Sequence, residues 1–514
     1  MRMNERLGRC VLLLLMLVVF IGGVQERVFG EDAKTEVKSF EQWYVMMMGG
    51  QRTGWTRAER KMDEGLVRTD TEMSMKVKRG PSELHIQLEQ VFWEDVSGKP
   101  RKASIVFNMG GGLAMKAQYR FEDDAVVQVT NQLGNDVEKR LPALPEDILG
   151  LAAMERQMEA AWKRGESTIK GRTVDVSMGV TIVEAEMTKV GEEVIEVYGR
   201  SVPAIVWDVK ASNLGGLVMR QYMDEEGKAL KMRVPLGAGL DVEMIAADKA
   251  LALSDLEAPE VMANTLIKPE KGSVKVRDIR KTKNAVYELR FDEVEGLDLD
   301  LPRTGTQKVV WGDEKRARVI VNVEEMNNPI DDLPTENDLA ETAMLQWKDE
   351  KVQSLIRQAL GEDMGKGLSD KEKASKLRKF VNDFIDEKSL AVGFASAAEI
   401  ARTKQGDCSE HATLLAAMLR GVEIPSRTVS GLMYIDKFLG KDNVLGYHMW
   451  TMAWIEEEDG GGWMDFDAVL ADRDYDAGHI ALAASSMNES EMSNDLVAML
   501  PIMGNVKVKV VRMK

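Results

Sequence analysis

Cysteine and histidine are scarce in this sequence. The 514 residues include two cysteines, Cys10 and Cys408, and four histidines. Cys10 starts an apolar run at the N-terminus, so a processed chain would keep Cys408 alone and could form no internal disulfide. The sequence also lacks a Cys/His cluster with zinc-ligand spacing, a P-loop and a dinucleotide fingerprint. These absences predict a protein with no disulfide framework, no metal and no other cofactor.

Long apolar runs are absent except for one at the N-terminus. Three arginines precede an apolar stretch over 10–21, and small residues around Gly30 offer a cleavage site. A membrane span needs about 20 apolar residues, and this run is shorter. We therefore expect residues 1–30 to be a signal peptide. The mature protein is expected to be exported, periplasmic or secreted, with no membrane span after cleavage.

Positive charge is in deficit, with 68 basic against 85 acidic side chains and a net charge of −17. Such a surface disfavours nucleic acids and anionic membranes as partners. Hydrophobic residues make up 44% of the chain, which is ordinary for globular proteins and sufficient for large cores. The length predicts about three domains.

The first part of the chain has the patterns of antiparallel β-structure. Apolar and polar side chains alternate over 72–78, which is the period of a half-buried strand. Two β-prone runs, 218–223 and 229–234, flank a turn and predict a hairpin. One helix is predicted from Leu151. Residues 31–268 are therefore expected to form a β-rich domain, with one curved sheet or two small sheets.

Two further units follow along the chain. Alternating patterns predict a small β domain, which ends in a proline-containing linker, over 269–334. Helical periodicity then begins, with Ser-x-x-Glu capping boxes at 369–372 and 396–399. A final strand over 505–513 is assigned to this last unit, 335–514. The expected fold class is α+β and multidomain, with antiparallel β-rich domains followed by an α+β core.

The most informative stretch surrounds the single internal cysteine. Asp407 is a good helix N-cap, and Glu410 stands three residues later, as in a capping box. This places Cys408 in the first turn of a helix, where the positive end of the dipole favours a thiolate. We expect a lowered pKa for this thiol. The same backbone N–H groups could help to hold a developing oxyanion.

A cysteine nucleophile needs a base, and the base needs an acceptor that orients it. His448 opens a strand-like run, and a glycine-rich turn leads from it to a second run with Asp465 and Asp467. Both aspartates share a face by parity, so either could reach the histidine. His411, one helical turn from the cysteine, is better suited to structural support. His479 could line the edge of the site or simply pack.

The stretch from about 370 to 470 resembles the transglutaminase-like superfamily, which has a papain-like core. Four motifs occur here in the family's order: Gly-Asp-Cys at 406–408, Ile-Pro-x-Arg at 424–427, His-x-Trp at 448–450 and Trp-x-x-x-Asp at 463–467. The resemblance covers about a fifth of the chain. It implies a catalytic core of the papain-like, transglutaminase-like type.

The resemblance also implies a role for three residues. Cys408 would be the nucleophile, His448 the base and Asp467 the orienting carboxylate. Asp467 fits the spacing from the tryptophan of its motif, whereas Asp465 does not. The sequence departs from the family at Met449, where alanine is common. It departs again after the aspartate, where alanine replaces a common proline. Neither change removes a catalytic group.

The implied chemistry is acyl transfer through a thioester on a protein or peptide substrate. Release by water would make the protein a cysteine peptidase or amidase, and release by a lysine amine would make it a cross-linking transglutaminase. Hydrolysis is the favoured alternative. Gln405 or a tryptophan could contribute to the oxyanion site, although a structural role for Gln405 is an equal alternative. Five further residues are predicted to support the site: Gln405, Asp407, His411, Trp450 and Trp463.

Two other classes of function stay open at this point. The domain could be a catalytically idle module that organises partners through the N-terminal β domains. Alternatively, the β-region could bind and deliver a lipid or a peptide. The intact Cys, His and Asp set favours the enzyme, because a substitution within the set would be expected of an idle module.

Overall fold

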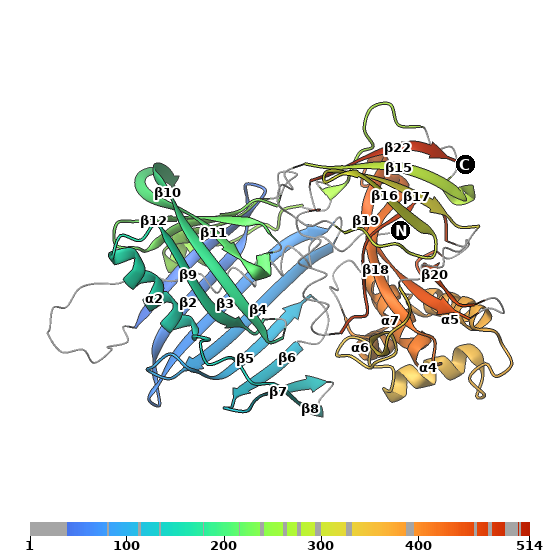
Figure 1. Ribbon diagram of the computed structural model, residues 1–514, viewed down its shortest axis with the longest axis horizontal. Helices are drawn as coiled ribbons and strands as arrows, with labels where there is room; N and C mark the ends of the chain where they lie inside the picture. Colours follow the sequence, from blue (N-terminus) through green and yellow to red (C-terminus); the bar gives the residue numbers. More distant parts are fainter. Residues whose placement is uncertain are drawn as a thin grey trace.

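The structure is a computed structural model in which three antiparallel sheets and a group of helices are arranged side by side (Figure 1). The described residues are 39–79, 82–110, 115–132, 135–177, 179–214, 216–236, 241–260, 265–274, 279–292, 300–324, 332–386, 395–456, 460–470, 475–488, 502 and 505–514. The predicted signal peptide lies outside them. Among the described residues, no helix combines the length and apolar character that crossing a bilayer requires.

The N-terminal region forms one sheet of 14 strands rather than two small sheets. Its first half contains β1 (Phe40–Met48), β2 (Gln51–Asp63), β3 (Leu66–Arg79), β4 (Ser82–Glu94), β5 (Pro100–Met109), β6 (Met115–Phe121), β7 (Ala125–Gln132) and β8 (Asn135–Pro142). Its second half contains β9 (Thr168–Asp175), β10 (Thr181–Val197), β11 (Arg200–Ala211), β12 (Val218–Met223), β13 (Ala229–Val234) and β14 (Val242–Ala247). The two halves join where β1 pairs with β14.

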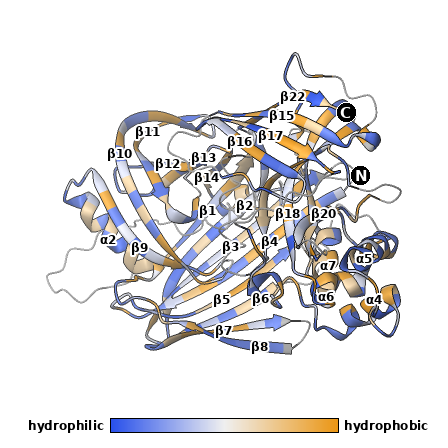
Figure 2. Ribbon diagram, turned by 45° about the vertical axis from the view of Figure 1, so that its right-hand side comes forward, coloured by the Kyte–Doolittle hydropathy of each residue, from blue (hydrophilic) through white to orange (hydrophobic). Residues whose placement is uncertain are grey.

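Residue patterns explain both the pleat and the bending of this sheet. Hydrophilic and hydrophobic residues alternate along its strands, as expected when one face is buried (Figure 2). The pairing of β1 with β2 shifts register between Met46 and Met47, opposite Gly54. A Cβ atom at Gly54 would lie 2.0 Å from the carbonyl oxygen of Ser74. Glycine at this position therefore lets neighbouring backbones approach closely beside the bulge.

The predicted helix is α2 (Leu151–Lys163), which packs on β9 and connects the two halves of the sheet. Its N-terminus is capped from a distance by Glu94, whose carboxylate accepts hydrogen bonds from Ala152 N and Ala153 N, each at 2.8 Å. Burial raises the pKa of Glu94 to about 7, and these two bonds only partly offset that effect. A buried carboxylate thus satisfies the free N–H groups at the start of the helix.

A second sheet contains four strands in the order β16-β17-β15-β22. They are β15 (Asn284–Phe291), β16 (Gln307–Asp313), β17 (Arg316–Asn322) and β22 (Val506–Met513). The sequence predicts that the final strand belongs to the C-terminal unit, but β22 pairs with β15, so it completes the small sheet instead. Its alternating valines specify a half-buried strand and carry no information about which sheet edge it joins.

The third sheet has the order β20-β19-β18-β21 and is covered by helices. Its elements are α4 (Glu350–Leu360), α5 (Asp370–Phe384), α6 (Ala397–Thr403), α7 (Cys408–Arg420), β18 (Ser426–Phe438), β19 (Lys441–Ile455), β20 (Gly462–Phe466) and β21 (His479–Ser485). Short helices elsewhere are α3 (Lys249–Ala252), η2 (Ser212–Leu214), η4 (Ile279–Lys281) and η5 (Glu336–Asp338). The first predicted capping box forms at Ser369, whereas the side chain of Ser396 makes no capping hydrogen bond.

Candidate active site

Helix α7 begins at the cysteine because of its capping residues. Asp407 accepts a hydrogen bond from Ser409 N at 3.1 Å, and Glu410 accepts one from Asp407 N at 2.9 Å, which completes the predicted capping box. Gly406 has φ +154°, and a Cβ there would lie 2.3 Å from the Cβ of Glu410. This tight turn places Cys408 as the first residue of a completely buried helix.

Cys408 is buried in a small apolar cluster that includes Met449 and Val469. Met449 follows His448 in β19, and Val469 lies two residues after Asp467. The neighbours of the cysteine therefore come from the same two chain segments that carry the predicted base and carboxylate. Met449, one of the departures from the family pattern, is part of the apolar surroundings of the thiol.

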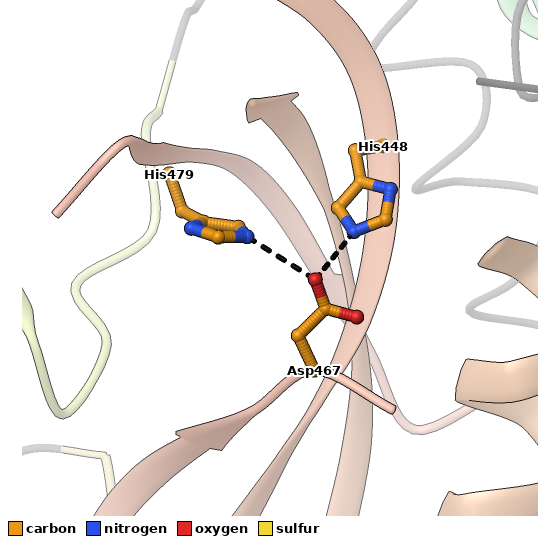
Figure 3. Close-up of side chains that lie close together, drawn as sticks. All are labelled: His448, Asp467 and His479. Carbon is orange, nitrogen blue, oxygen red and sulfur yellow. Dashed lines mark hydrogen bonds and ion pairs between the residues drawn. The ribbon is translucent and has the colours of Figure 1, made fainter. Parts of the chain in front are cut away.

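His448 and Asp467 are directly hydrogen-bonded, with 2.8 Å between Nε2 and Oδ2 (Figure 3). The other carboxylate oxygen of Asp467 accepts a bond from Val469 N at 2.8 Å. The bond to Asp467 assigns the proton of the neutral ring to Nε2. His448 Nδ1 is buried and has no hydrogen-bond partner in the described part of the chain. This nitrogen is thus available to accept a proton.

A third residue, His479, points at the same carboxylate (Figure 3). Its Nε2 lies 3.3 Å from Asp467 Oδ2, and its Nδ1 donates to the carbonyl oxygen of Asp476 at 2.9 Å. From the sequence alone, His479 could either line the edge of the site or simply pack in the core. The only signal that could have selected it was the scarcity of histidine, because its contacts depend on long-range strand pairing.

The electrostatics of this cluster follow from its pairing. Burial opposes the ionisation of Asp467, but the charges of His448 and His479 and their hydrogen bonds outweigh it and hold the pKa of Asp467 below its ordinary value. Burial likewise disfavours the charged form of His479. Its hydrogen bonds with Asp467 and Asp476 and the charges of both carboxylates prevail and raise the pKa of His479 to about 9. At neutral pH, Asp467 is therefore a carboxylate and His479 an imidazolium.

His448, Asp467 and His479 each offer one atom that could bind a metal ion, and these atoms all lie within 4.8 Å of one another. A metal ion binds the neutral imidazole, so it would have to displace the proton that His479 holds at neutral pH. Both N–H groups of His479 already have acceptors in Asp467 and Asp476. The geometry and charges therefore fit a proton-sharing cluster better than a metal centre.

The two aspartates that the sequence left as alternatives have different partners. Asp465 accepts hydrogen bonds from Thr306 Oγ1 at 2.6 Å, Thr304 Oγ1 at 2.9 Å and Trp450 Nε1 at 2.9 Å. Burial raises the pKa of Asp465, and these three bonds only partly oppose it. Asp465 thus holds a loop of the small sheet, and Asp467 is the aspartate that meets His448.

The predicted supporting residues occupy varied places. The ring of Trp450 stacks on that of His448, with centroids 6.2 Å apart. His411 is buried and hydrogen-bonds through Nδ1 to the carbonyl oxygen of the helix N-cap, which agrees with structural support. Gln405 lies half-buried between α6 and α7. Trp463 contributes to a network around an arginine.

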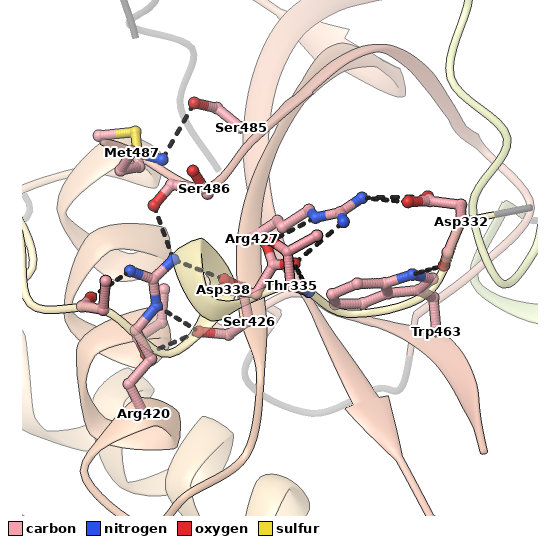
Figure 4. A network of polar contacts seen from close by, with 12 residues as sticks. Asp332, Thr335, Asp338, Arg420, Ser426, Arg427, Trp463, Ser485, Ser486 and Met487 are labelled. Carbon is pink, nitrogen blue, oxygen red and sulfur yellow. Dashed lines mark hydrogen bonds and ion pairs between the residues drawn. The ribbon is translucent and has the colours of Figure 1, made fainter. Parts of the chain in front are cut away.

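That network connects the predicted linker to the third sheet (Figure 4). Arg427, from the Ile-Pro-x-Arg turn, pairs with Asp332 at 2.8 Å and Asp338 at 2.7 Å. Its guanidinium lies 4.3 Å from the ring centroid of Trp463, whose indole N–H donates to the carbonyl oxygen of Asp332. Arg420, at the end of α7, donates to three backbone carbonyl oxygens nearby. These contacts give the turn motif a structural role.

Comparison with protein families gives a clear match for this region. Residues 358–468 match the model of the transglutaminase-like superfamily. The chain carries a transglutaminase-like domain. The resemblance predicted from the motifs is therefore confirmed, and the match begins at residue 358, before the predicted start at about 370. No curated protein matches the chain significantly.

Several solved structures are similar to parts of the chain. A β-barrel-like protein of a domain family of unknown function from Brucella abortus has a TM-score of 0.31 and 10% identity, and the alignment covers 41% of this chain and 96% of that one. A candidate cysteine protease from Cytophaga hutchinsonii has a TM-score of 0.26 and 16% identity, with 45% and 86% covered. A candidate protease from Parabacteroides distasonis has a TM-score of 0.16 and 10% identity, with 61% and 72% covered.

Proposed function

We propose that this protein is a cysteine enzyme that cleaves amide bonds through a thioester, with Cys408, His448 and Asp467 as its triad. The observation that carries the proposal is the His448–Asp467 hydrogen bond of 2.8 Å, which leaves the buried Nδ1 of His448 without a partner among the described residues. The strand that carries His448 packs on α7, and Cys408 begins that helix. An activated thiol needs such a base with an orienting acceptor.

The reaction follows the roles of these groups. The proton of Cys408 passes to His448 Nδ1, and the thiolate attacks the carbonyl carbon of the amide. The C–N bond breaks, the amine leaves with the proton from His448, and a thioester remains. Water then attacks the thioester, with His448 again as base, and the acid and the free thiol are released. Asp467 keeps the ring oriented throughout, and backbone N–H groups at the start of α7 stabilise the oxyanion.

Water and a lysine amine are the two acceptors that could complete the reaction. Cys408 is buried beside Met449 and Val469. A water molecule reaches a buried thioester more readily than a lysine side chain on a second protein does. We therefore favour hydrolysis of a peptide or protein over cross-linking. The same proposal places the enzyme outside the cytoplasm, on the strength of the signal-peptide pattern over 1–30.

The first test is the pH dependence of iodoacetamide labelling of Cys408. We expect fast labelling well below pH 8, because a paired thiolate forms below the ordinary thiol pKa of about 8.5. His448→Ala should move this labelling upward in pH, and a Cys408→Ala chain measures any labelling at Cys10. His85→Ala is the matched control, since His85 lies on β4 in the N-terminal sheet. Labelling that follows an ordinary thiol and ignores His448→Ala would contradict the proposal.

The acceptor is tested separately with a mixture of glutamine-containing peptides and a fluorescent primary amine. We expect peptide fragments to accumulate faster than the amine is incorporated, and both reactions to disappear in Cys408→Ala. Amine incorporation that exceeds hydrolysis would favour the cross-linking enzyme instead.

A further inference from the structure

The proposed triad needs one imidazole hydrogen-bonded to Asp467, but in the structure two imidazoles contact this carboxylate. Asp467 Oδ2 lies 2.8 Å from His448 Nε2 and 3.3 Å from His479 Nε2, and all three side chains are fully buried. Because Oδ1 accepts a bond from Val469 N, the carboxylate is held at both oxygens. His479 therefore touches the group that orients the proposed base.

His479 is itself fixed on every side. Its Nδ1 donates to the carbonyl oxygen of Asp476 at 2.9 Å and lies 3.3 Å from Asp476 Oδ1. The ring of Tyr475 stacks on it at a centroid distance of 4.3 Å, and Trp450 meets it edge-on at 5.2 Å. Two acceptors and two aromatic rings thus hold one orientation and leave little freedom for the ring to turn.

The charge of His479 matters because no bulk water screens it. A buried cation is stable only when it is paired, and Asp467 and Asp476 supply that pairing. The pKa of about 9 agrees with a ring that stays protonated at neutral pH. Asp465 also lies near enough to interact with this charge. The ring centroids of His479 and His448 are 5.8 Å apart, so the two rings would repel each other if both were protonated.

We propose that His479 is a positioning residue of the triad, whose buried imidazolium fixes the carboxylate of Asp467 and favours the thiolate form of Cys408. This inference rests on the proposed function of Cys408, His448 and Asp467. The carboxylate that both imidazoles share keeps the ring of His448 in one orientation. A buried positive charge in the same site also stabilises the negative charge of the thiolate.

The test compares the pH profile of Cys408 labelling in wild type and in His479→Gln. The glutamine can still donate an N–H group to Asp467 but carries no charge. The profile should rise as the thiol of Cys408 ionises. We expect its midpoint to move upward by about one pH unit in His479→Gln, since a nearby charge shifts a pKa by about one to three units. A merely structural role would change the folded fraction and leave the midpoint in place.

A second measurement keeps the test decisive if His479→Gln fails to fold. Nitrogen-15 NMR of the wild type, labelled at its four histidines, reports directly whether the ring of His479 is charged. Two protonated ring nitrogens on His479 at pH 7 support the proposal, and a neutral ring overturns it. His85→Gln serves as the histidine control on another sheet. If wild type itself labels as an ordinary thiol and ignores His448→Ala, the proposed function fails, and that result is distinct from failure of His479 alone.

Discussion

Two regions at the end of β20 differ sharply although their central aspartates are two residues apart. In the cluster of Asp467, His448 and His479, two imidazoles lower the pKa of the carboxyl group. In the junction around Asp465, the donors are neutral hydroxyl and indole groups, so burial prevails and the pKa is raised. Both carboxyl groups are fully buried. The charge of the donors, and not the depth of burial, therefore decides in which direction the pKa of each aspartate moves.

The junction joins the small sheet to the transglutaminase-like domain. A Cβ on Gly305 would lie 1.5 Å from the carbonyl oxygen of Trp463, so the loop before β16 rests directly on the backbone of β20. The side-chain amide of Gln307 makes two hydrogen bonds with the backbone of Ala481. Its Nε2 donates to the carbonyl oxygen at 2.9 Å, and its Oε1 accepts from the backbone N–H at 2.8 Å, so Gln307 covers the backbone of β21. Trp450 connects the two regions, because its indole N–H meets Asp465 while its ring stacks on His448.

The largest expected difference between the regions is in activity. Asp467→Asn should reduce peptide hydrolysis by roughly a thousandfold or more, because the amide favours the wrong imidazole tautomer and cannot balance the charge of His448. Asp465→Asn should reduce it by less than about tenfold, because that carboxyl group contacts no reacting atom. The measurement is kcat/KM on a peptide that the wild type cleaves.

Folding must be checked for both variants by circular dichroism and by thermal unfolding. Asp465→Asn is expected to lose about 1–3 kcal/mol of unfolding free energy, since the junction keeps its shape but loses one matched acceptor. Equal losses of activity in two folded variants would show that the aspartates are not divided between chemistry and structure as proposed.

Much of this comparison could be predicted from local sequence, and the rest could not. Capping residues around Cys408 and the turn between the runs at His448 and Asp467 act over short distances, so their geometry is visible in the sequence. The loop over 304–307 and the edge that β22 joins depend on contacts between residues more than 150 positions apart. The contact of His479 with Asp467 could not be predicted either, because it depends on the pairing of β21 with β18, which no local pattern specifies.

The next largest effect is in the pH dependence of stability. The pKa of His479 rises from about 6.5 in the unfolded chain to about 9 in the folded one. Its stabilising contribution is therefore complete below pH 6.5 and is lost as the pH rises through 9, with a total on the order of 3 kcal/mol. Asp467 has the opposite sign: its contribution is present above about pH 4 and is lost on acidification, because its folded pKa is depressed.

Thermal unfolding between pH 5 and 9.5 measures this effect. The wild type should lose Tm steadily from pH 6.5 to 9, and His479→Gln should start lower and lose less over the same range. His85→Gln should keep the slope of the wild type between pH 7 and 9, because burial lowers the pKa of His85 and places its titration below this window. Parallel curves for wild type and His479→Gln would show that the buried charge of His479 does not contribute to folding.

The smallest expected effect concerns the stability of the junction around Asp465. Thr306→Val removes one hydroxyl donor from Asp465 with little change in shape, while Thr306→Ser keeps the donor. We expect Thr306→Val to lower the free energy of unfolding by about 1–2 kcal/mol in urea titrations, and Thr306→Ser to lose less. The labelling profile of Cys408 should keep its midpoints in both variants, because Thr306 contacts Asp465 and neither substitution changes a charge, while Asp465 reaches the triad only through the packing of Trp450 and the charge of His479. If Thr306→Val moved those midpoints as far as His479→Gln does, the junction would take part in setting the ionisation of the triad, and the two regions would have to be treated as one.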